Sequence, residues 1–351
     1  MTAIARLLSL ATAAPAHAVP QRDLMQAAGR YFGANGVDVD RLLPAFLHAG
    51  IDNRHLCEPL DWYQRPIGWK TRNDAFLRHA PALLADAARR AVADAGLSFG
   101  DIDQIVTVCS TGVATPSLDA LLMERLPFRE TVGRLPIFGL GCAGGVTGLG
   151  AAARLARAEP GTNVLFLVVE LCTLTFRSGD RRKANIIATA LFGDGAAAAV
   201  VRAQTIANDN PAILHAGERR WPGTLDVMGW DVAEDGLTVL FSRDIPALVR
   251  DKVRPAACDY LARHGLGLAD IDGFIAHPGG AKVIDALEEV FGLQTGGMVD
   301  ARAVLRDYGN MSAATVMFVL DRMLRRGLRG RNLMSALGPG FTGSFLTLEA
   351  A

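Results

Sequence analysis

The eight residues GLSFGDID at Gly96–Asp103 recur with the same pattern as GLGLADID at Gly265–Asp272. Each copy follows a stretch with apolar residues at helical spacing and precedes a short apolar run that is typical of a buried strand. A repeat this long in only two copies indicates a duplicated domain, because solenoids need three or more short units. The flanking stretches are 82–95 and 104–108 in the first half, and 246–263 and 273–276 in the second.

Two more pairs of segments correspond between the halves, the first of them at nearly the same separation along the chain. The sequence GCAGG at 141–145 opens an Ala-rich helix, and YGNMS at 308–312 opens another. A third pair, LFGDG at 191–195 and LGPG at 337–340, predicts a strand, a glycine turn and a second strand in each half. We therefore expect an N-terminal half over residues 1–205 and a C-terminal half over residues 206–351.

The character of the apolar segments indicates the fold class. Residues 164–169 are continuously apolar and rich in β-branched side chains, which is typical of a sheet covered by helices on both faces. Residues 3–13 read as a first strand before a proline-bounded turn, although this stretch also imitates a short signal peptide. No apolar run approaches the roughly 18 residues of a spanning helix. We predict a layered α/β protein without a transmembrane segment.

Charge and cysteine content exclude several classes of protein. The 351 residues include 36 basic and 36 acidic side chains, so the formal net charge is zero and nothing indicates a nucleic-acid partner. The five cysteines are odd in number and form no C-x-x-C pair, which argues against a disulfide framework and against structural zinc. We therefore expect a small-molecule ligand, no metal and a cytoplasmic location.

Cys142 is the candidate nucleophile. At the start of a helix, its sulfur would lie near unpaired backbone N–H groups and the positive end of the helix dipole, which would lower the pKa of the thiol. The absence of bulky side chains at 143–145 would let a thioester approach closely. A lone cysteine is more often an inert small hydrophobic residue, but a glycine-flanked helix start offers access and little packing.

His277 and Asn310 are the candidate partners of this cysteine. His277 follows the apolar strand at 273–276 and precedes Pro-Gly-Gly, a place where α/β proteins commonly carry catalytic groups, so we expect it to act as the base. Asn310 alone would read as a helix N-cap. However, Asn310 corresponds to Cys142 in the repeat. We therefore expect Asn310 and His277 together to donate hydrogen bonds to the carbonyl oxygen of a thioester and so to stabilise a developing enolate.

These motifs and their order resemble the type III polyketide synthases, the chalcone-synthase-like enzymes, over essentially the whole chain. The resemblance implies a homodimer with a thiolase-like fold, in which two pseudo-duplicated halves form a layered αβαβα arrangement. It also implies that Cys142 is acylated, that His277 and Asn310 promote malonyl decarboxylation and condensation, and that the substrates are coenzyme A thioesters with no permanently bound cofactor. The motifs are GCAGG at 141–145, FR at 176–177, ALFGDGAA at 190–197, IAHPGG at 275–280, YGNMS at 308–312 and GPG at 338–340.

The resemblance also assigns substrate-binding positions. Phe192 matches a gatekeeper phenylalanine between the coenzyme A tunnel and the cavity, although it could also be a core aromatic before a tight turn. The second gatekeeper of the family falls near Val239, where the aromatic ring is absent. Trp230 matches a lining position, or else it is a core residue. The remaining positions that we assign to the substrate site are Cys172, Thr175, Gly338, Pro339 and Gly340.

Contacts to coenzyme A are less well marked. The basic cluster that the family carries near the end of its first long helix is reduced here to Arg41, His48 and Arg54. Lys282 lies five residues past His277 and is either a further coenzyme A contact or a solvated helix residue. We expect these four residues to hold the carrier of acyl-CoA and malonyl-CoA.

The stretches 171–176 and 228–232 look most like those of bacterial enzymes that make alkylpyrones or alkylresorcinols. We therefore expect a fatty acyl-CoA starter that is extended with malonyl-CoA. One alternative is a ketoacyl-acyl-carrier-protein synthase of type III, which performs a single condensation. Alternatives from other classes are a papain-like cysteine protease, which also uses Cys, His and Asn in this chain order, and a non-enzymatic scaffold with the same fold.

Overall fold

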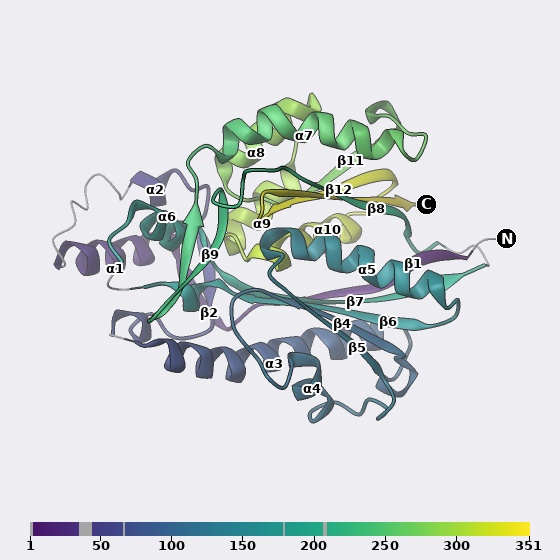
Figure 1. The fold of residues 1–351 in the computed structure, drawn as a ribbon, viewed down its shortest axis with the longest axis horizontal. Helices are drawn as coiled ribbons and strands as arrows, with labels where there is room; N and C mark the ends of the chain where they lie inside the picture. Colours follow the sequence, from purple (N-terminus) through teal and green to yellow (C-terminus); the bar gives the residue numbers. More distant parts are fainter. Residues whose placement is uncertain (1–2, 35–43, 66, 178–179, 206–208) are drawn as a thin grey trace.

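The computed structural model describes residues 3–34, 44–65, 67–177, 180–205 and 209–351. Five layers follow one another from the bottom to the top of Figure 1. The outer helix α3 (Trp69–Asp94) covers the N-terminal strands, and α7 (Ile245–Ala262) with α8 (Ala281–Phe291) covers the C-terminal strands. Between the two groups of strands lie α5 (Gly144–Ala158) and α10 (Thr315–Arg325). The predicted αβαβα layering is confirmed.

The two groups of strands have the same internal order and directions. In the N-terminal group, β4 runs parallel to β6, and β6, β7 and β1 are successively antiparallel. In the C-terminal group, β11 is parallel to β12, and β12, β13 and β8 are successively antiparallel. A short pairing of β1 with β8 joins them into one sheet ordered β11-β12-β13-β8-β1-β7-β6-β4-β5. The strands are β1 (Ile4–Ala13), β4 (Gln104–Cys109), β5 (Gly133–Phe138), β6 (Asn163–Leu171), β7 (Asp194–Gln204), β8 (Ala212–Arg220), β11 (Gly273–Ala276), β12 (Gly330–Gly338) and β13 (Thr342–Ala350).

The repeated octapeptide forms the same turn in both halves. Gly96 (φ +68°) ends the turn after α3, and Gly265 (φ +69°) ends the turn after α7, each in the left-handed region that favours glycine. The carboxylate of Asp103 accepts a hydrogen bond from the backbone N–H of Asn163, and that of Asp272 accepts one from the N–H of Arg331. Each aspartate thus ties the start of one strand to its neighbour. The expected division near residue 205 falls beside residues 206–208, which are outside the described part of the chain.

Two expectations for local structure had different outcomes. β1 lies in the middle of the sheet between β7 and β8, so residues 3–13 form the expected strand. The segment before Phe192 is helix α6 (Lys183–Leu191) and not a strand, so the third pair of segments is only partly alike. A short apolar run does not by itself distinguish a helix from a strand. Within the described residues, no helix is long and apolar enough to cross a membrane.

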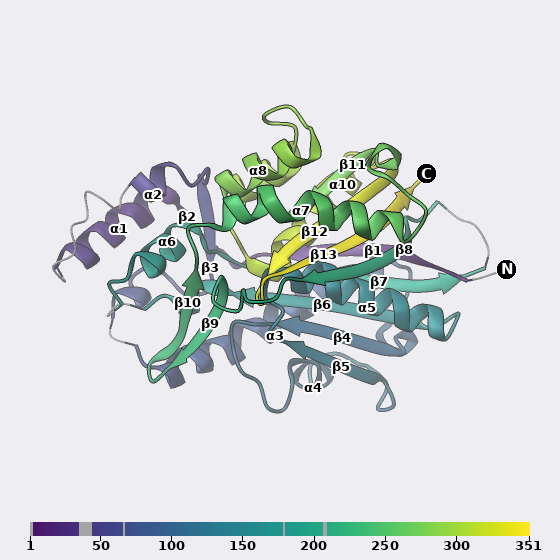
Figure 2. The same ribbon diagram turned by 45° about the horizontal axis from the view of Figure 1, so that its top comes forward.

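The two central helices approach closely where they begin. A Cβ atom on Gly145 would lie 2.3 Å from the carbonyl oxygen of Ala313, just before α10, so this crossing requires a glycine. The smaller elements gather at one end of the molecule, where Figure 2 shows α1, α6 and the β9–β10 hairpin together. These are β2 (His17–Pro20), α1 (Gln21–Ala34), α2 (Pro44–Leu47), β3 (Asn53–Leu56), β9 (Met228–Ala233) and β10 (Gly236–Phe241); α4 (Leu118–Met123) and α9 (Val299–Tyr308) complete the fold.

Candidate active site

A cavity of about 780 Å³, which includes space open to solvent, lies beside the starts of the two central helices. Cys142, His277 and Asn310 all line it, so the structure brings together the three residues that the sequence singled out. Cys142 comes from the single turn before α5, His277 follows β11, and Asn310 precedes the turn that opens α10. The duplicated architecture therefore delivers the sulfur and the amide from matching positions.

The backbone around Cys142 is tightly held. Gly141 has φ +47°, and a Cβ atom there would lie 2.6 Å from the ring of Pro339, so glycine is required at this turn. The N–H of Gly141 donates to Oγ of Ser110 at 3.0 Å. The sulfur of Cys142 lies 3.5 Å from Oγ of Ser312.

The electrostatics of the cavity differ from the expectation for a helix start. Burial raises the pKa of the Cys142 thiol to about 12 and lowers the pKa of His277 to about 3. The prediction of a lowered thiol pKa is therefore wrong, because removal of the sulfur from water outweighs the effect of the helix start. Both side chains are neutral at pH 7.

His277 and Asn310 differ in how firmly they are fixed. The backbone N–H of His277 donates to the carbonyl of Ser335 at 2.8 Å, while within the described chain neither ring nitrogen has a hydrogen-bond partner. Oδ1 of Asn310 accepts from the N–H of Ser312 at 2.8 Å, and Nδ2 donates to the carbonyl of Gly279 at 3.2 Å. The amide is thus oriented, and both nitrogens of the imidazole remain available to a group in the cavity.

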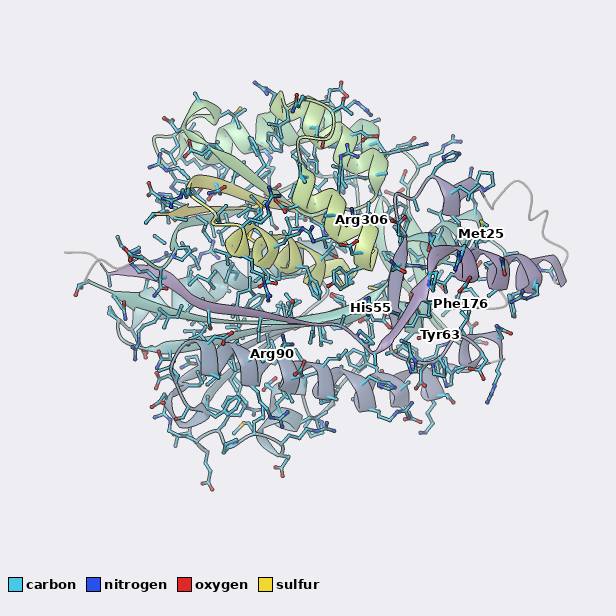
Figure 3. The ribbon with its side chains drawn as sticks, turned by 180° about the vertical axis from the view of Figure 1, so that it is seen from behind. Met25, His55, Tyr63, Arg90, Phe176 and Arg306 are labelled. Atoms are coloured by element: carbon cyan, nitrogen blue, oxygen red, sulfur yellow. The ribbon has the colours of Figure 1, made fainter. Side chains whose placement is uncertain are left out.

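A second cavity of about 680 Å³ adjoins the first. Phe192 and Val239 line both cavities, which places them at the boundary between the two spaces. Cys172 and Thr175 line the second cavity, whereas Trp230 lines the first and packs against Phe192 with ring centroids 5.9 Å apart. Figure 3 labels Tyr63 and Phe176, two further wall residues of the second cavity that come from distant parts of the sequence.

The Gly-Pro-Gly motif at residues 338–340 contributes to the wall of the first cavity. Pro339 lines it directly. A Cβ atom on Gly338 would lie 2.6 Å from the carbonyl oxygen of Leu140, and Gly340 turns the chain with φ +102°. The two glycines therefore let strand β12 and the turn into β13 approach the cysteine loop.

The residues that we assigned to coenzyme A lie in different places. Arg41 is outside the described residues, and His48 and Lys282 are exposed. Arg54 is only 2% exposed and donates from Nη1 to the carbonyls of Thr189 and Phe192. The burial of Arg54 conflicts with a contact to the phosphates of coenzyme A, which are strongly hydrated and would bind at a cavity mouth. Arg54 lies two residues before the end of β3, on the buried side of that strand, where its side chain meets the end of α6.

Two polar residues near the sulfur were not predicted as part of the site. Ser312 has φ +46°, which is unusual for a residue other than glycine, and its hydroxyl is the one that meets Cys142. Glu170 is fully buried, accepts from the N–H of Ser110 and the hydroxyl of Thr111, and has its pKa raised to about 8 by burial. The sequence could have indicated Glu170 as a site residue, because it is the one acidic side chain in the mostly apolar strand β6.

The described residues contain no group of three or more His, Cys, Asp or Glu side chains that could hold a metal ion. The constellation is instead a thiol, a neutral imidazole and an oriented amide around an apolar cavity, between the halves of a layered αβαβα fold. Such a site suits transfer of an acyl group to sulfur and stabilisation of an enolate oxygen by hydrogen-bond donors. Fold and site together define a thiolase-like condensing enzyme.

Comparison with known proteins specifies the class further. The family model "Chalcone and stilbene synthases, N-terminal domain" matches residues 63–205, and the corresponding C-terminal domain model matches residues 213–349. The chain is 37% identical to a putative chalcone synthase of Bacillus subtilis, over 98% of each chain. It is 36% identical to 1,3,6,8-tetrahydroxynaphthalene synthase of Streptomyces peucetius, over 96% of this chain and 91% of the relative. The crystal structure of PKS-I from the brown alga Ectocarpus siliculosus superposes with a TM-score of 0.94 at 28% identity, covering 100% of this chain and 99% of the other.

The chain therefore belongs to the chalcone and stilbene synthase family, the type III polyketide synthases. It is a decarboxylating condensing acyltransferase that acts on coenzyme A thioesters. The family match also removes the papain-like protease from the alternatives.

Alkylation of Cys142 tests the electrostatics of the cavity. Because only the thiolate reacts and burial raises the pKa of Cys142 to about 12, the rate of modification by iodoacetamide should still rise steeply above pH 9. Peptide mass spectrometry would follow the reaction between pH 6 and pH 10.5, with the exposed Cys258 as reference in the same chain. A rate at Cys142 that levels off below about pH 8 would indicate a thiolate stabilised at neutral pH, contrary to this structure.

Proposed function

We propose that this enzyme loads a fatty acyl group from coenzyme A onto Cys142, extends it with malonyl-CoA and cyclises the product to an alkylpyrone or alkylresorcinol. The observation that carries the proposal is the second cavity, which begins at the boundary formed by Phe192 and Val239 and is separate from the space around the sulfur. An acyl chain on Cys142 needs such a space if the growing polyketide is to occupy the first cavity.

The walls of the second cavity favour an aliphatic chain. Most of them are apolar, and half of them come from α1, β3 and α6. A valine stands at position 239, where the family pattern has a phenylalanine. Burial of each methylene group of an acyl chain is favourable by about 0.8 kcal/mol. The apolar wall residues include Leu24, Ala27, Ala28, Leu56, Leu60, Phe176 and Ala188.

Loading begins with two neutral side chains. As the sulfur of Cys142 attacks the starter thioester, His277 takes the thiol proton, and the departing coenzyme A sulfur receives a proton from His277 as it leaves. The low pKa of His277 disfavours the first transfer and favours the second, so the imidazole holds the proton only briefly and is neutral again before malonyl-CoA binds.

Condensation then uses the same residues as hydrogen-bond donors. Malonyl-CoA loses carbon dioxide, and the enolate oxygen that develops accepts hydrogen bonds from the neutral imidazole of His277 and from Nδ2 of Asn310. The enolate carbon attacks the acyl carbonyl on Cys142 and releases the sulfur. The apolar surroundings strengthen these hydrogen bonds because little water competes for them.

The exposed side chains of His48 and Lys282 remain our proposed contacts for coenzyme A. Lys282 is exposed on the first turn of α8, next to Val283, which lines the first cavity. This position would allow the ammonium group to meet phosphate groups at the cavity mouth while the thioester reaches Cys142.

Replacement of Asn310 by alanine should slow malonyl decarboxylation by about 10²–10³, the usual effect of removing one donor to an oxyanion. Acylation of Cys142 should change little, because no hydrogen bond joins the amide to the sulfur among the described residues. Release of carbon dioxide from malonyl-CoA and the mass of the acyl-enzyme would be measured separately. Decarboxylation at the original rate would exclude this role, and equal loss of both steps would indicate a disturbed fold.

A series of acyl-CoA starters of increasing chain length, each mixed with malonyl-CoA, tests the substrate and the product. Mass spectrometry should show tri- or tetraketide pyrones or resorcinols that retain the starter chain. Val239→Phe should shift the preference to shorter starters by narrowing the boundary between the cavities, with Val232→Phe as control on the exposed face of β9. Products with one added malonyl unit would favour the ketoacyl synthase alternative, and aromatic products made from malonyl-CoA alone would contradict a fatty starter.

We also propose that the enzyme is a homodimer that associates through β5. Within the described residues β5 pairs only with β4, so its other edge is open at the end of the sheet. Three large apolar side chains beside this edge are exposed, namely Val113 (49%), Leu135 (41%) and Phe138 (59%). A second copy would cover both the apolar side chains and the unpaired strand edge.

Sedimentation velocity would test this arrangement. The protein should sediment as a dimer, and Phe138→Glu should shift it to the monomer because it would place a charge in the covered surface. Glu substituted for the exposed Leu225, which is far along the chain from β5, serves as the control. A Phe138→Glu protein that stays dimeric would place the interface elsewhere.

A further inference from the structure

One of the polar side chains in the described walls of the second cavity carries a formal charge, which an aliphatic chain would not use. The side chain of Arg54 lines this cavity and is only 2% exposed. Its Nη1 donates to the backbone carbonyls of Thr189 and Phe192. Its Nε and Nη2 have no hydrogen-bond partner among the described residues. An unpaired charged donor in such a place is costly unless a ligand satisfies it.

The neighbouring polar groups have partners of their own. The hydroxyl of Tyr63 bonds to Oγ1 of Thr173 at 2.7 Å. The carboxylate of Asp194 accepts from the N–H of Cys57 and from the N–H and hydroxyl of Thr173. Burial lowers the pKa of Arg54 to about 9, so the guanidinium still carries its charge at pH 7. The charge is therefore present, and neither neighbour occupies its free edge.

The geometry of the free edge specifies the ligand. Nε and Nη2 lie on one side of the planar guanidinium and point two N–H groups in parallel, the arrangement that binds both oxygens of a carboxylate. Nη1, on the other side, is already held by two carbonyls that fix the plane of the group. A single hydroxyl would satisfy only one of the two free donors, and a carboxylate satisfies both.

We propose that the second cavity binds the far end of an acyl chain that terminates in a carboxylate, so that the preferred starters include monothioesters of linear dicarboxylic acids. This inference rests on the proposed function, in which the starter extends from Cys142 past Phe192 and Val239. The methylene groups would contact the apolar wall, and the terminal carboxylate would pair with Nε and Nη2 of Arg54. A free carboxylic acid offers the same chemistry from a second source.

The experiment compares matched starters of equal carbon number. For chains of 6 to 12 carbons, kcat/KM is measured for the fatty acyl-CoA and for the monothioester of the corresponding dicarboxylic acid. The wild-type enzyme should prefer the dicarboxylic starter at the chain length that reaches Arg54. Arg54→Met should lower the ratio of the two kcat/KM values at that length by about ten- to a hundredfold, the effect of losing charged hydrogen bonds. Because the ratio compares two substrates of one protein, a partly disturbed fold lowers both kcat/KM values and leaves their ratio unchanged.

Two variants separate the carboxylate contact from structural effects. Arg54→Lys keeps the positive charge and loses the paired donors, so it should also lower the ratio. Arg72→Met is the matched control: Arg72 is likewise buried and donates to backbone carbonyls, at Ile67 and Leu174, but does not belong to the walls of the second cavity. Its ratio should equal that of the wild type.

The free acid is tested by calorimetry with octanoate. Binding that disappears in Arg54→Met would support the carboxylate site even if no starter were extended, and would then assign it to a free acid. The proposal is overturned if the wild type prefers the plain starter at every length and does not bind octanoate, or if the preference survives in Arg54→Met. Failure of every acyl-CoA to yield product would instead overturn the proposed function.

Discussion

The close crossing of the two central helices is the constraint on which the site depends. Gly145 lies against the carbonyl oxygen of Ala313, and a single methyl group at this position would collide with the backbone of the other half. Because interiors are packed as densely as crystals, such a contact sets the spacing of the helices to a few tenths of an ångström. That spacing in turn affects how far the sulfur of Cys142 lies from the amide of Asn310, since Cys142 lies in the turn that leads into α5 and Asn310 precedes the turn that leads into α10.

Burial around these helices gives the site its chemical character. A thiol with a raised pKa and a histidine with a lowered pKa together avoid an ion pair in the cavity. A buried ion pair is stable only when many hydrogen bonds compensate for the loss of water, and the imidazole of His277 has none from the described residues. Cys142 and His277 therefore stay neutral until a substrate binds. Hydrogen-bond donors that are already in place then stabilise the charge that develops during the reaction.

Sequence patterns predicted the parts of this structure that repeat or that follow a simple period. The paired octapeptides located two helix-turn-strand units, and the glycine-flanked helix starts located Cys142 and Asn310. Features that arise from packing between distant segments were not predictable in this way. Arg54 reads as a surface cation beside the basic residues of the N-terminal region, but the packing of the buried side of β3 against the end of α6 places it inside. The sign of the pKa shift at Cys142 likewise depends on burial, which no local pattern reveals.

The backbone bridge between Phe192 and Asn310 has a consequence for how the family diversifies. The N–H of Asn310 donates to the carbonyl of Leu191, and the N–H of Gly193 donates to the carbonyl of Asn310. This connection uses main-chain atoms alone, so it is indifferent to which side chain stands at position 192. Substitution at position 192 can therefore widen or narrow the passage between the two cavities while the catalytic amide keeps its place. The choice of substrate can change in this way without a change in the chemistry.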